Sequence, residues 1–243
     1  MTRGQRLSSG DPEEAAKAVQ EPVLLLSVNP LVAVTDSFLA PKHCAGLIEL
    51  GRGRLARAQV GSDTRALEVS ASRSNSDAYL PPSQLPEVAA LMERMAAVVA
   101  MPVLHGEGLS VLHYAPGQEF KPHVDGIWSG AGDAARAEFD GDGGQRLFTA
   151  ILYLNGVDGG GATVFPKLGL RVPPEPGRLL VFANTEAGSS DATPRAMHAG
   201  EPVTTGEKWV AVSWWRERPF AYPASDALHS KVSRKAHDAT PAR

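Results

Sequence analysis

Two histidines and one carboxylate could together hold a metal ion. His123 and Asp125 lie two positions apart in a segment that reads as a strand, and such side chains point to the same side of a strand. A third ligand must come from elsewhere, and His198 opens a second promising segment, residues 198–209. Two imidazoles and one carboxylate, with the other metal positions open, are the ligand set of non-haem Fe(II) oxygenases.

The surroundings of the first pair make it more than a chance occurrence. A His-x-acid pair is a weak signal alone, and the chain has another in His105 and Glu107, which we expect to be incidental. The pair at the candidate site follows Tyr114 and Gly117. Lys208 lies ten residues beyond the last histidine, where its ammonium could neutralise the carboxylate of a bound acid.

A series of further motifs surrounds these residues in a fixed order. They are Gly106-Glu-Gly-Leu-Ser-Val-Leu-His-Tyr-Ala-Pro-Gly-Gln118, His123-x-Asp125, Gly143-Gly-Gln-Arg146, Tyr153-Leu-Asn155, Gly159-Gly-Gly-Ala-Thr163, Phe165-Pro166, His198-Ala-Gly and Gly206-Glu-Lys-Trp209. Through them residues 105–220 resemble the catalytic domain of the prolyl 4-hydroxylase family of 2-oxoglutarate- and Fe(II)-dependent dioxygenases, most closely its bacterial single-domain members. Residues 30–104 fit the helical N-terminal part of that family more loosely.

The resemblance implies a reaction and its cofactors. Fe(II) would be held by His123, Asp125 and His198, with 2-oxoglutarate as cosubstrate and ascorbate to rescue oxidised iron. The enzyme would hydroxylate an unactivated C–H bond, foremost C4 of a prolyl residue in a protein or peptide, and release succinate and CO2. The carboxylate of Asp125 argues against a halogenase, in which chloride would need that position.

The resemblance also assigns residues to the two bound molecules. Lys208 would pair with the far carboxylate of 2-oxoglutarate, beside Tyr153 and Tyr114, and Thr149 could add a further hydroxyl. A lysine ammonium has three donors, so a hydroxyl partner is expected.

Two further residues are expected to line the peptide pocket, Arg146 and Trp214. Arginine can bond a peptide carbonyl, and an aromatic face suits a proline ring. The chain departs from the plant and animal pattern at Arg216, where a histidine is frequent, and at Trp128. Both departures bear on the identity of the peptide and leave the metal chemistry untouched.

Composition places the chain among ordinary globular proteins. It has 243 residues, 43% of them hydrophobic and 21% charged, with a net charge of −3. That charge gives no electrostatic case for nucleic acid or an anionic membrane as partner. The single cysteine, Cys44, excludes an internal disulfide and is expected to be a buried core thiol. With a polar N-terminus that does not read as a secretory signal, this indicates a cytoplasmic protein.

The elements needed to position these residues read as mainly β with flanking helices (α+β), around a double-stranded β-helix or jelly-roll core. Helices are expected at residues 41–50 and 86–100, as supports for the sheet. Strands are expected at residues 23–28, 31–34, 109–114, 120–124, 146–154, 162–165, 178–182, 195–199 and 208–216. Residues 53–80 read as polar and irregular.

This reading divides the chain into four parts. Residues 1–21 are expected to be a flexible tail, 22–104 the N-terminal strands and support helices, 105–220 the catalytic jelly roll, and 221–243 a second flexible tail. Glycine-rich residues 126–144 and residues 184–194 are candidate lids, because long loops in compact domains are often functional. Acidic residues in the first of these loops lack the spacing of a calcium site.

Two alternatives stay open. The same chemistry could act on a free amino acid or small metabolite, and a substrate screen would separate the two. In a different class of protein, the same ligands could hold zinc in a non-catalytic jelly-roll binding module. That alternative gives no purpose to Lys208 or to the tyrosines beside it.

Overall fold

The computed structural model describes residues 22–58, 60–61, 67–68, 73–128 and 143–220. The strands of the larger sheet are β1 (Val23–Val28), β2 (Leu31–Thr35), β3 (Ala56–Arg57), β6 (Ser76–Leu80), β7 (Leu109–Tyr114), β9 (Arg146–Tyr153), β13 (Leu179–Ala183) and β16 (Lys208–Arg216). Those of the smaller sheet are β8 (Phe120–His123), β11 (Thr163–Phe165), β12 (Leu170–Val172) and β14 (His198–Gly200). Two short pairs join β4 (Val60–Gly61) to β5 (Leu67–Glu68) and β10 (Gly159–Gly160) to β15 (Val203–Thr205). The helices are α2 (Pro41–Arg52) and α3 (Pro86–Val99), with 3-10 turns at Val103–His105 and Pro194–Ala196.

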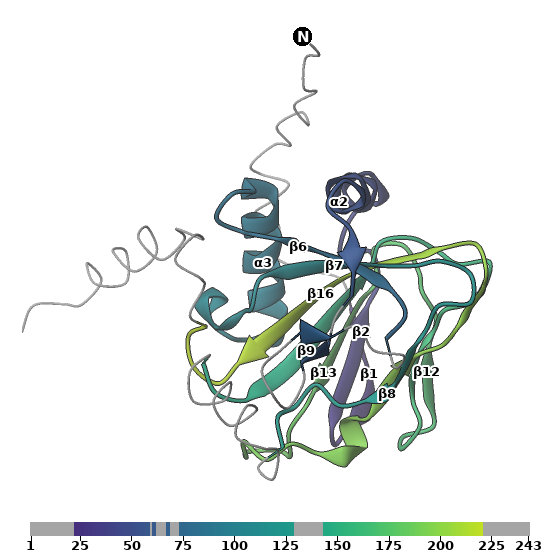
Figure 1. Ribbon diagram of the computed structural model, residues 1–243. Coiled ribbons are helices and arrows are strands. Elements are labelled where there is room, and N and C mark those ends of the chain that lie inside the picture. Colours follow the sequence, from purple (N-terminus) through teal and green to yellow (C-terminus); the bar gives the residue numbers. More distant parts are fainter. Residues whose placement is uncertain (1–21, 59, 62–66, 69–72, 129–142, 221–243) are drawn as a thin grey trace, which may run out of the picture.

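The two sheets form the expected jelly roll. The larger is eight-stranded, in the order β1-β2-β13-β9-β16-β7-β6-β3, and the smaller is four-stranded, in the order β12-β11-β14-β8. In Figure 1 both helices lie on one side of the large sheet, and β8 and β12 lie away from them. β1 and β2 join the large sheet through β13, so the N-terminal strands extend the sheet that carries the catalytic motifs.

The central strands are buried on both faces, which explains their nearly continuous apolar sequence. On β9, Ala150 and Leu152 contact the core beneath the helices, whereas Ile151 and Tyr153 contact the core between the sheets. Because side chains alternate along a strand, every second residue of β9 faces the smaller sheet. The same alternation applies to β16 and decides which residues line the space between the sheets.

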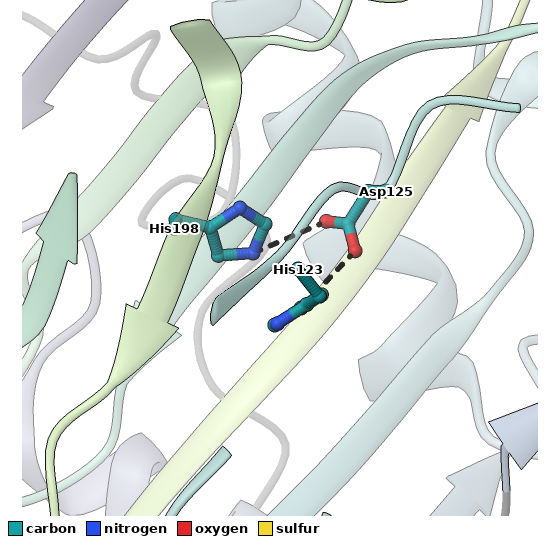
Figure 2. A group of neighbouring side chains, drawn as sticks. All are labelled: His123, Asp125 and His198. Atoms are coloured by element: carbon teal, nitrogen blue, oxygen red, sulfur yellow. Dashed lines mark ion pairs between the residues drawn. The ribbon is translucent and has the colours of Figure 1, made fainter. Parts of the chain in front are cut away.

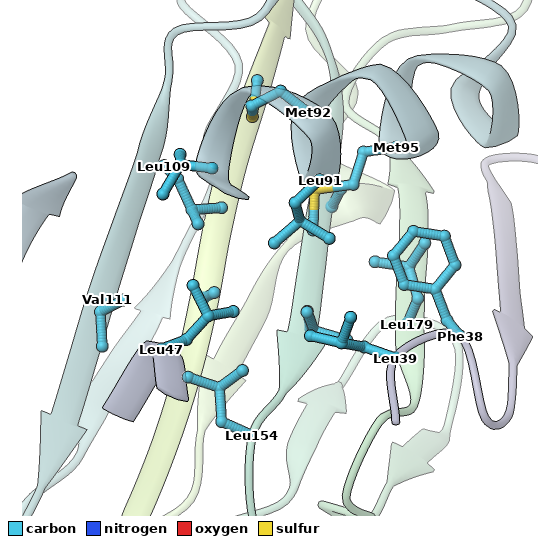
Figure 3. Packing of buried hydrophobic residues seen from close by; sticks show 14 of the residues in the cluster. Phe38, Leu39, Leu47, Leu91, Met92, Met95, Leu109, Val111, Leu154 and Leu179 are labelled. Carbon is cyan, nitrogen blue, oxygen red and sulfur yellow. The ribbon is translucent and has the colours of Figure 1, made fainter. Parts of the chain in front are cut away.

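Both helices present an apolar stripe to the large sheet. α2 begins with Pro41, whose fixed backbone suits a first helical position, and buries Cys44 and Leu47. α3 buries Leu91, Met92 and Met95 among others, and Figure 3 shows these three side chains directed from the helix toward the strands. The predicted buried cysteine and support helices are confirmed.

Truncating the centre of the α3 stripe should destabilise the fold. Met95 is fully buried, so Met95→Ala removes packed atoms and leaves a cavity, which typically costs about 2–5 kcal/mol of unfolding free energy. Glu93→Ala, on the exposed face of the same helix, should change it by less than about 0.5 kcal/mol. Urea unfolding of both variants measures the difference, and equal losses would contradict this packing.

The structure differs from the sequence prediction in several places. Ser76–Leu80, within a stretch expected to be irregular, forms β6 and pairs with β7. Residues 195–197 do not start a strand, because Pro194 opens a 3-10 turn and β14 begins only at His198. β8 ends at His123, so Asp125 follows the strand instead of lying on it.

Some expectations fall on segments that the structure does not describe. The tails at residues 1–21 and 221–243, and most of the loop predicted at 126–144, lie outside the described residues. None of the described helices combines the length and the apolar character that crossing a bilayer demands.

Candidate active site

The pairing of β8 with β14 creates the site. His123 lies directly opposite His198 in this antiparallel pair, and Asp125 comes just after β8 ends. The Nε2 atom of His123 lies 3.5 Å from Oδ1 of Asp125, and Nε2 of His198 lies 3.6 Å from Oδ2. Figure 2 shows the three side chains converging on one point. They form the one cluster of possible metal ligands among the described residues.

Backbone contacts orient both imidazoles. Nδ1 of His123 lies 2.8 Å from the Lys121 carbonyl, and Nδ1 of His198 lies 3.1 Å from the Ala196 carbonyl. A carbonyl only accepts hydrogen bonds, so each Nδ1 carries the proton and each Nε2 keeps a lone pair. Stacking against Phe120 also fixes the His123 ring, with centroids 3.6 Å apart.

The protonation states also suit a metal. Burial lowers the pKa of His198 to about 4, despite the attraction of Asp125. Burial would by itself raise the pKa of Asp125, but the charges of His198 and His123 outweigh it, so this pKa lies below its usual range. At neutral pH His198 is therefore neutral and Asp125 ionised, as metal ligands must be.

This donor set fits Fe(II). Metal bonds from imidazole and carboxylate are about 2.0–2.2 Å long, so two ligand atoms of one ion would lie at most about 4.4 Å apart. The 3.5 and 3.6 Å separations, each from one imidazole to a different carboxylate oxygen, fall within that limit. Three protein ligands on one side leave other positions for a cosubstrate and O2.

A pocket extends from this cluster along the face of β16. Lys208, Val210, Val212 and Trp214 alternate along that face and line the pocket. Lys208 pairs with Tyr114 at one end, and Trp214 pairs with Thr149 at the other. The lysine and the tryptophan are six residues apart, or roughly 20 Å along a strand. The two ends can therefore serve two different bound molecules.

Lys208 is a buried cation at the first end. Its side chain is 3% exposed, and its Nζ lies 5.1 Å from the centre of the Tyr114 ring and 5.8 Å from that of Tyr153. Burial lowers the pKa of Lys208 to about 8. A buried ammonium is costly unless it is paired, so the pocket favours a bound carboxylate at this point.

The two tyrosines of the sequence prediction occupy different positions. Tyr114 lines the pocket. Tyr153 is fully buried behind it and donates its hydroxyl proton to Oγ1 of Thr163, at 2.7 Å. Thr163 itself lines the pocket. The hydroxyl that faces the pocket is therefore that of Thr163, whereas the sequence analysis predicted that of Tyr153. Burial raises the pKa of both tyrosines, that of Tyr114 to about 12.

Thr149 lies at the opposite end from Lys208. Its Oγ1 is 2.7 Å from Oδ2 of Asp125, and its strand partner is Trp214. The structure therefore places this hydroxyl against the carboxylate of the triad and not beside the lysine.

Trp214 and Arg146 lie together over a buried carboxylate. The Arg146 guanidinium stacks on the Trp214 ring at 4.7 Å and forms a two-pronged contact with Glu107, at 2.6 and 2.9 Å. Arg216 also donates to Glu107, at 2.5 Å. Burial would raise the pKa of Glu107, but the two guanidinium groups outweigh it and hold that pKa below its usual range. Thus Glu107, expected to be incidental, fixes both arginines.

Gln145 ties the segments on either side of the site together. Its side-chain oxygen accepts from the Ile127 amide at 2.7 Å, and its nitrogen donates to the carbonyls of Ile127 and Ser190, at 2.7 and 3.0 Å. The first segment follows Asp125 directly, and the second lies in the loop expected at residues 184–194. That loop is held in place at Ser190 by this contact.

Several residues around the pocket were not singled out from the sequence. Arg73, which lines it and stacks on Phe120 at 5.2 Å, comes from a stretch with no helical or strand periodicity. Gln145 and Thr163 each stand inside a recognised motif, and that position could have identified them as candidate site residues. Glu107 also stands inside a recognised motif, whereas Asn184 does not, and its importance depends on a partner distant in the sequence.

Comparison with known proteins places this site in a family. Residues 109–216 match the family model described as the 2OG-Fe(II) oxygenase superfamily. The chain is 31% identical to prolyl 4-hydroxylase 5 of Arabidopsis thaliana, over 90% of this chain and 79% of that protein. It is 32% identical to prolyl 4-hydroxylase 2 of the same plant, over 78% and 68% of the two chains.

Solved structures share the fold. The viral collagen prolyl hydroxylase of Paramecium Bursaria Chlorella virus-1, in its 2-oxoglutarate complex, aligns with a TM-score of 0.59 and 25% identity, over 75% of this chain and 94% of that one. A Pseudomonas putida prolyl-4-hydroxylase aligns with a TM-score of 0.51 and 22% identity, over 76% and 92%. The chain described here belongs to the prolyl 4-hydroxylase family of the 2OG-Fe(II) oxygenase superfamily and is a 2-oxoglutarate- and Fe(II)-dependent dioxygenase.

Proposed function

We propose that the pocket hydroxylates C4 of a prolyl residue in a protein or peptide, with His123, Asp125 and His198 holding Fe(II). The observation that carries this is a single pocket containing both the triad and a buried lysine. Fe(II) bound there supplies the oxidising chemistry, while 2-oxoglutarate and O2 are consumed and succinate and CO2 released. The names of the curated relatives support the prolyl substrate.

The residues of the pocket divide the work between its two ends. Lys208 binds the far carboxylate of 2-oxoglutarate, with Tyr114 and Thr163 beside it, and the burial of Tyr153 keeps their positions fixed. The apolar side chains of Val210 and Val212 exclude water between the ends, which limits side reactions of the reactive centre. These residues bind and orient and take no proton themselves.

At the other end, Trp214 and Arg146 receive the substrate. An aromatic surface offers contact area to a proline ring, and Trp214 lines the pocket. Glu107 holds Arg146 rigid through two hydrogen bonds, so little side-chain entropy is lost when a peptide carbonyl binds. Ascorbate would restore oxidised iron, and the lone cysteine favours a cytoplasmic location.

Arg146→Lys should separate substrate binding from cosubstrate turnover. A lysine cannot reproduce the two-pronged contact with Glu107, so we expect the KM for a peptide to rise about 10- to 100-fold, the loss of about 1.4–2.7 kcal/mol. The 2-oxoglutarate turnover that occurs without peptide should stay close to that of the wild type. Steady-state assays with and without peptide measure both quantities.

A matched control exists on the surface. Arg178 makes the same kind of two-pronged contact with Asp36, at 2.6 and 3.3 Å, away from the pocket. Arg178→Lys should leave the peptide KM unchanged. Equal effects of the two substitutions would remove Arg146 from the substrate site.

A substrate screen tests the proposal itself. Peptides with a single prolyl residue are incubated with the enzyme, Fe(II), 2-oxoglutarate and ascorbate, and mass spectrometry and NMR locate any added oxygen. Oxygen at C4 of the prolyl ring is the expected result. Turnover with free amino acids and none with any peptide would replace the prolyl substrate by a small metabolite.

A further inference from the structure

A buried chain of two hydrogen bonds ends on the carboxylate of Asp125. Oγ1 of Thr149 lies 2.7 Å from Oδ2 of Asp125, and Nδ2 of Asn184 lies 2.9 Å from the same threonine oxygen. Thr149 and Asn184 are each 1% exposed. Because both side chains are shielded from solvent, these hydrogen bonds are electrostatically stronger than they would be in water.

The direction of these bonds follows from proton counting. Asp125 is ionised and can only accept, so the single hydroxyl proton of Thr149 must point to it. The threonine oxygen then accepts from the amide nitrogen of Asn184. With the amide reversed, a carbonyl oxygen would face an oxygen whose proton is already used, and two acceptors would repel each other.

Burying the Asn184 amide costs folding free energy, which indicates that its hydrogen bond to Thr149 has a role. Its Oδ1 is buried, and no described residue donates to it. A buried polar atom without a partner costs about 1–3 kcal/mol, which an apolar residue of similar size would avoid. The backbone of Asn184 is fixed on both sides, donating to the Leu147 carbonyl at 2.8 Å and accepting from the Thr193 amide at 2.9 Å.

We propose that Thr149 and Asn184 are positioning residues for Asp125, and that Thr149 takes no part in binding 2-oxoglutarate. The hydrogen bond to Oδ2 fixes the rotation of the carboxylate, which favours binding of the metal through one oxygen and leaves the remaining positions open. This inference rests on the metal site of the proposed function. The register of β16 supports the exclusion of Thr149 from the 2-oxoglutarate site. Thr149 pairs with Trp214, while Lys208 lies at the other end of the strand.

Mn(II) affinity measured by electron paramagnetic resonance tests the proposal without turnover. Thr149→Val keeps the shape of the side chain and loses the hydroxyl, and loss of such a partner typically weakens metal binding about 10- to 100-fold. Thr149→Ser retains the hydroxyl and should restore binding. With Mn(II) saturating, the Kd of 2-oxoglutarate for Thr149→Val should equal that of the wild type.

A double-variant comparison tests the role of Asn184. Asn184→Leu should weaken Mn(II) binding less than Thr149→Val does, because the threonine can still donate. The double variant should bind no more weakly than Thr149→Val alone, since Asn184 acts only through the hydroxyl. Unfolding of the metal-free proteins shows whether each variant folds.

Three results would overturn the proposal. They are wild-type Mn(II) affinity in a folded Thr149→Val, a raised Kd of 2-oxoglutarate in that variant, and fully additive losses in the double variant. A wild type that binds no Mn(II) would contradict the metal site itself, and the proposed function with it.

Discussion

His198→Ala is expected to abolish turnover by removing one of three metal ligands. His198 is 4% exposed and directly opposite His123, so no other described imidazole can replace it. Removing a residue that only hydrogen-bonds to a metal ligand lowers metal affinity about 10- to 100-fold. Removing the ligand itself should lower it further. Fe(II) affinity under anaerobic conditions and succinate release measure the two effects.

The exposed histidine of α2 provides the control. His43 lies on the solvent side of that helix, so His43→Ala should retain both metal binding and turnover. Because His198 is buried between Phe165 and Phe182, the metal-free variants must also be compared by unfolding. Undiminished succinate release by a folded His198→Ala would remove this histidine from the metal site.

Lys208→Met should have the second large effect, on the cosubstrate. Removing the buried ammonium at that end of the described pocket leaves the far carboxylate of 2-oxoglutarate without its ion-pair partner, which costs about 3–5 kcal/mol. We therefore expect 2-oxoglutarate to bind at least about 100-fold more weakly. Isothermal titration of the metal-loaded variant measures this, and Mn(II) affinity should be unchanged.

The same substitution should stabilise the protein without ligands. The pKa of Lys208 is about 8 when folded and about 10.4 when unfolded. Between these values the unfolded chain binds more protons, so this group makes the folded state more stable as pH rises from about 8 to about 10.4. At pH 7 the buried charge therefore costs stability, which Lys208→Met removes.

Affinity for 2-oxoglutarate has the opposite pH dependence. Above pH 8 the free enzyme loses the ammonium, so the Kd should rise about tenfold for each further pH unit. A 2-oxoglutarate affinity that is flat from pH 7 to 10 would show that this lysine does not serve the cosubstrate. A less stable Lys208→Met would contradict the stability cost of burying this charge.

Much of the fold could be predicted because the strands are nearly all apolar. β7, β9 and β16 are buried on both faces, which gives long uninterrupted runs between glycine turns, and these are visible without a structure. β6 was missed because its sequence, Ser-Asp-Ala-Tyr-Leu, is only half buried, and its pairing with β7 joins residues that are 29 to 37 positions apart, from Leu80 with Leu109 to Ser76 with His113.

The site was predictable in its ligands and less so in their supports. The triad and Lys208 stand in sequence motifs, and their residue types indicate metal binding and carboxylate binding. Glu107 and Asn184 matter only through Arg146 and Thr149, which are distant in sequence. Thr149 shows the limit most clearly. Its hydroxyl could serve the metal carboxylate or the cosubstrate, and only the register of β9 against β16 decides between them.

Anaerobic addition of Fe(II) and then 2-oxoglutarate tests most directly whether the triad and Lys208 form one active site. Two-point binding of the 2-oxo acid to iron gives a weak visible charge-transfer band. We expect the band in the wild type at stoichiometric iron, its absence in His198→Ala, and its appearance only at much higher 2-oxoglutarate in Lys208→Met. An iron-loaded wild type with no band at any 2-oxoglutarate concentration would contradict the assignment of this pocket.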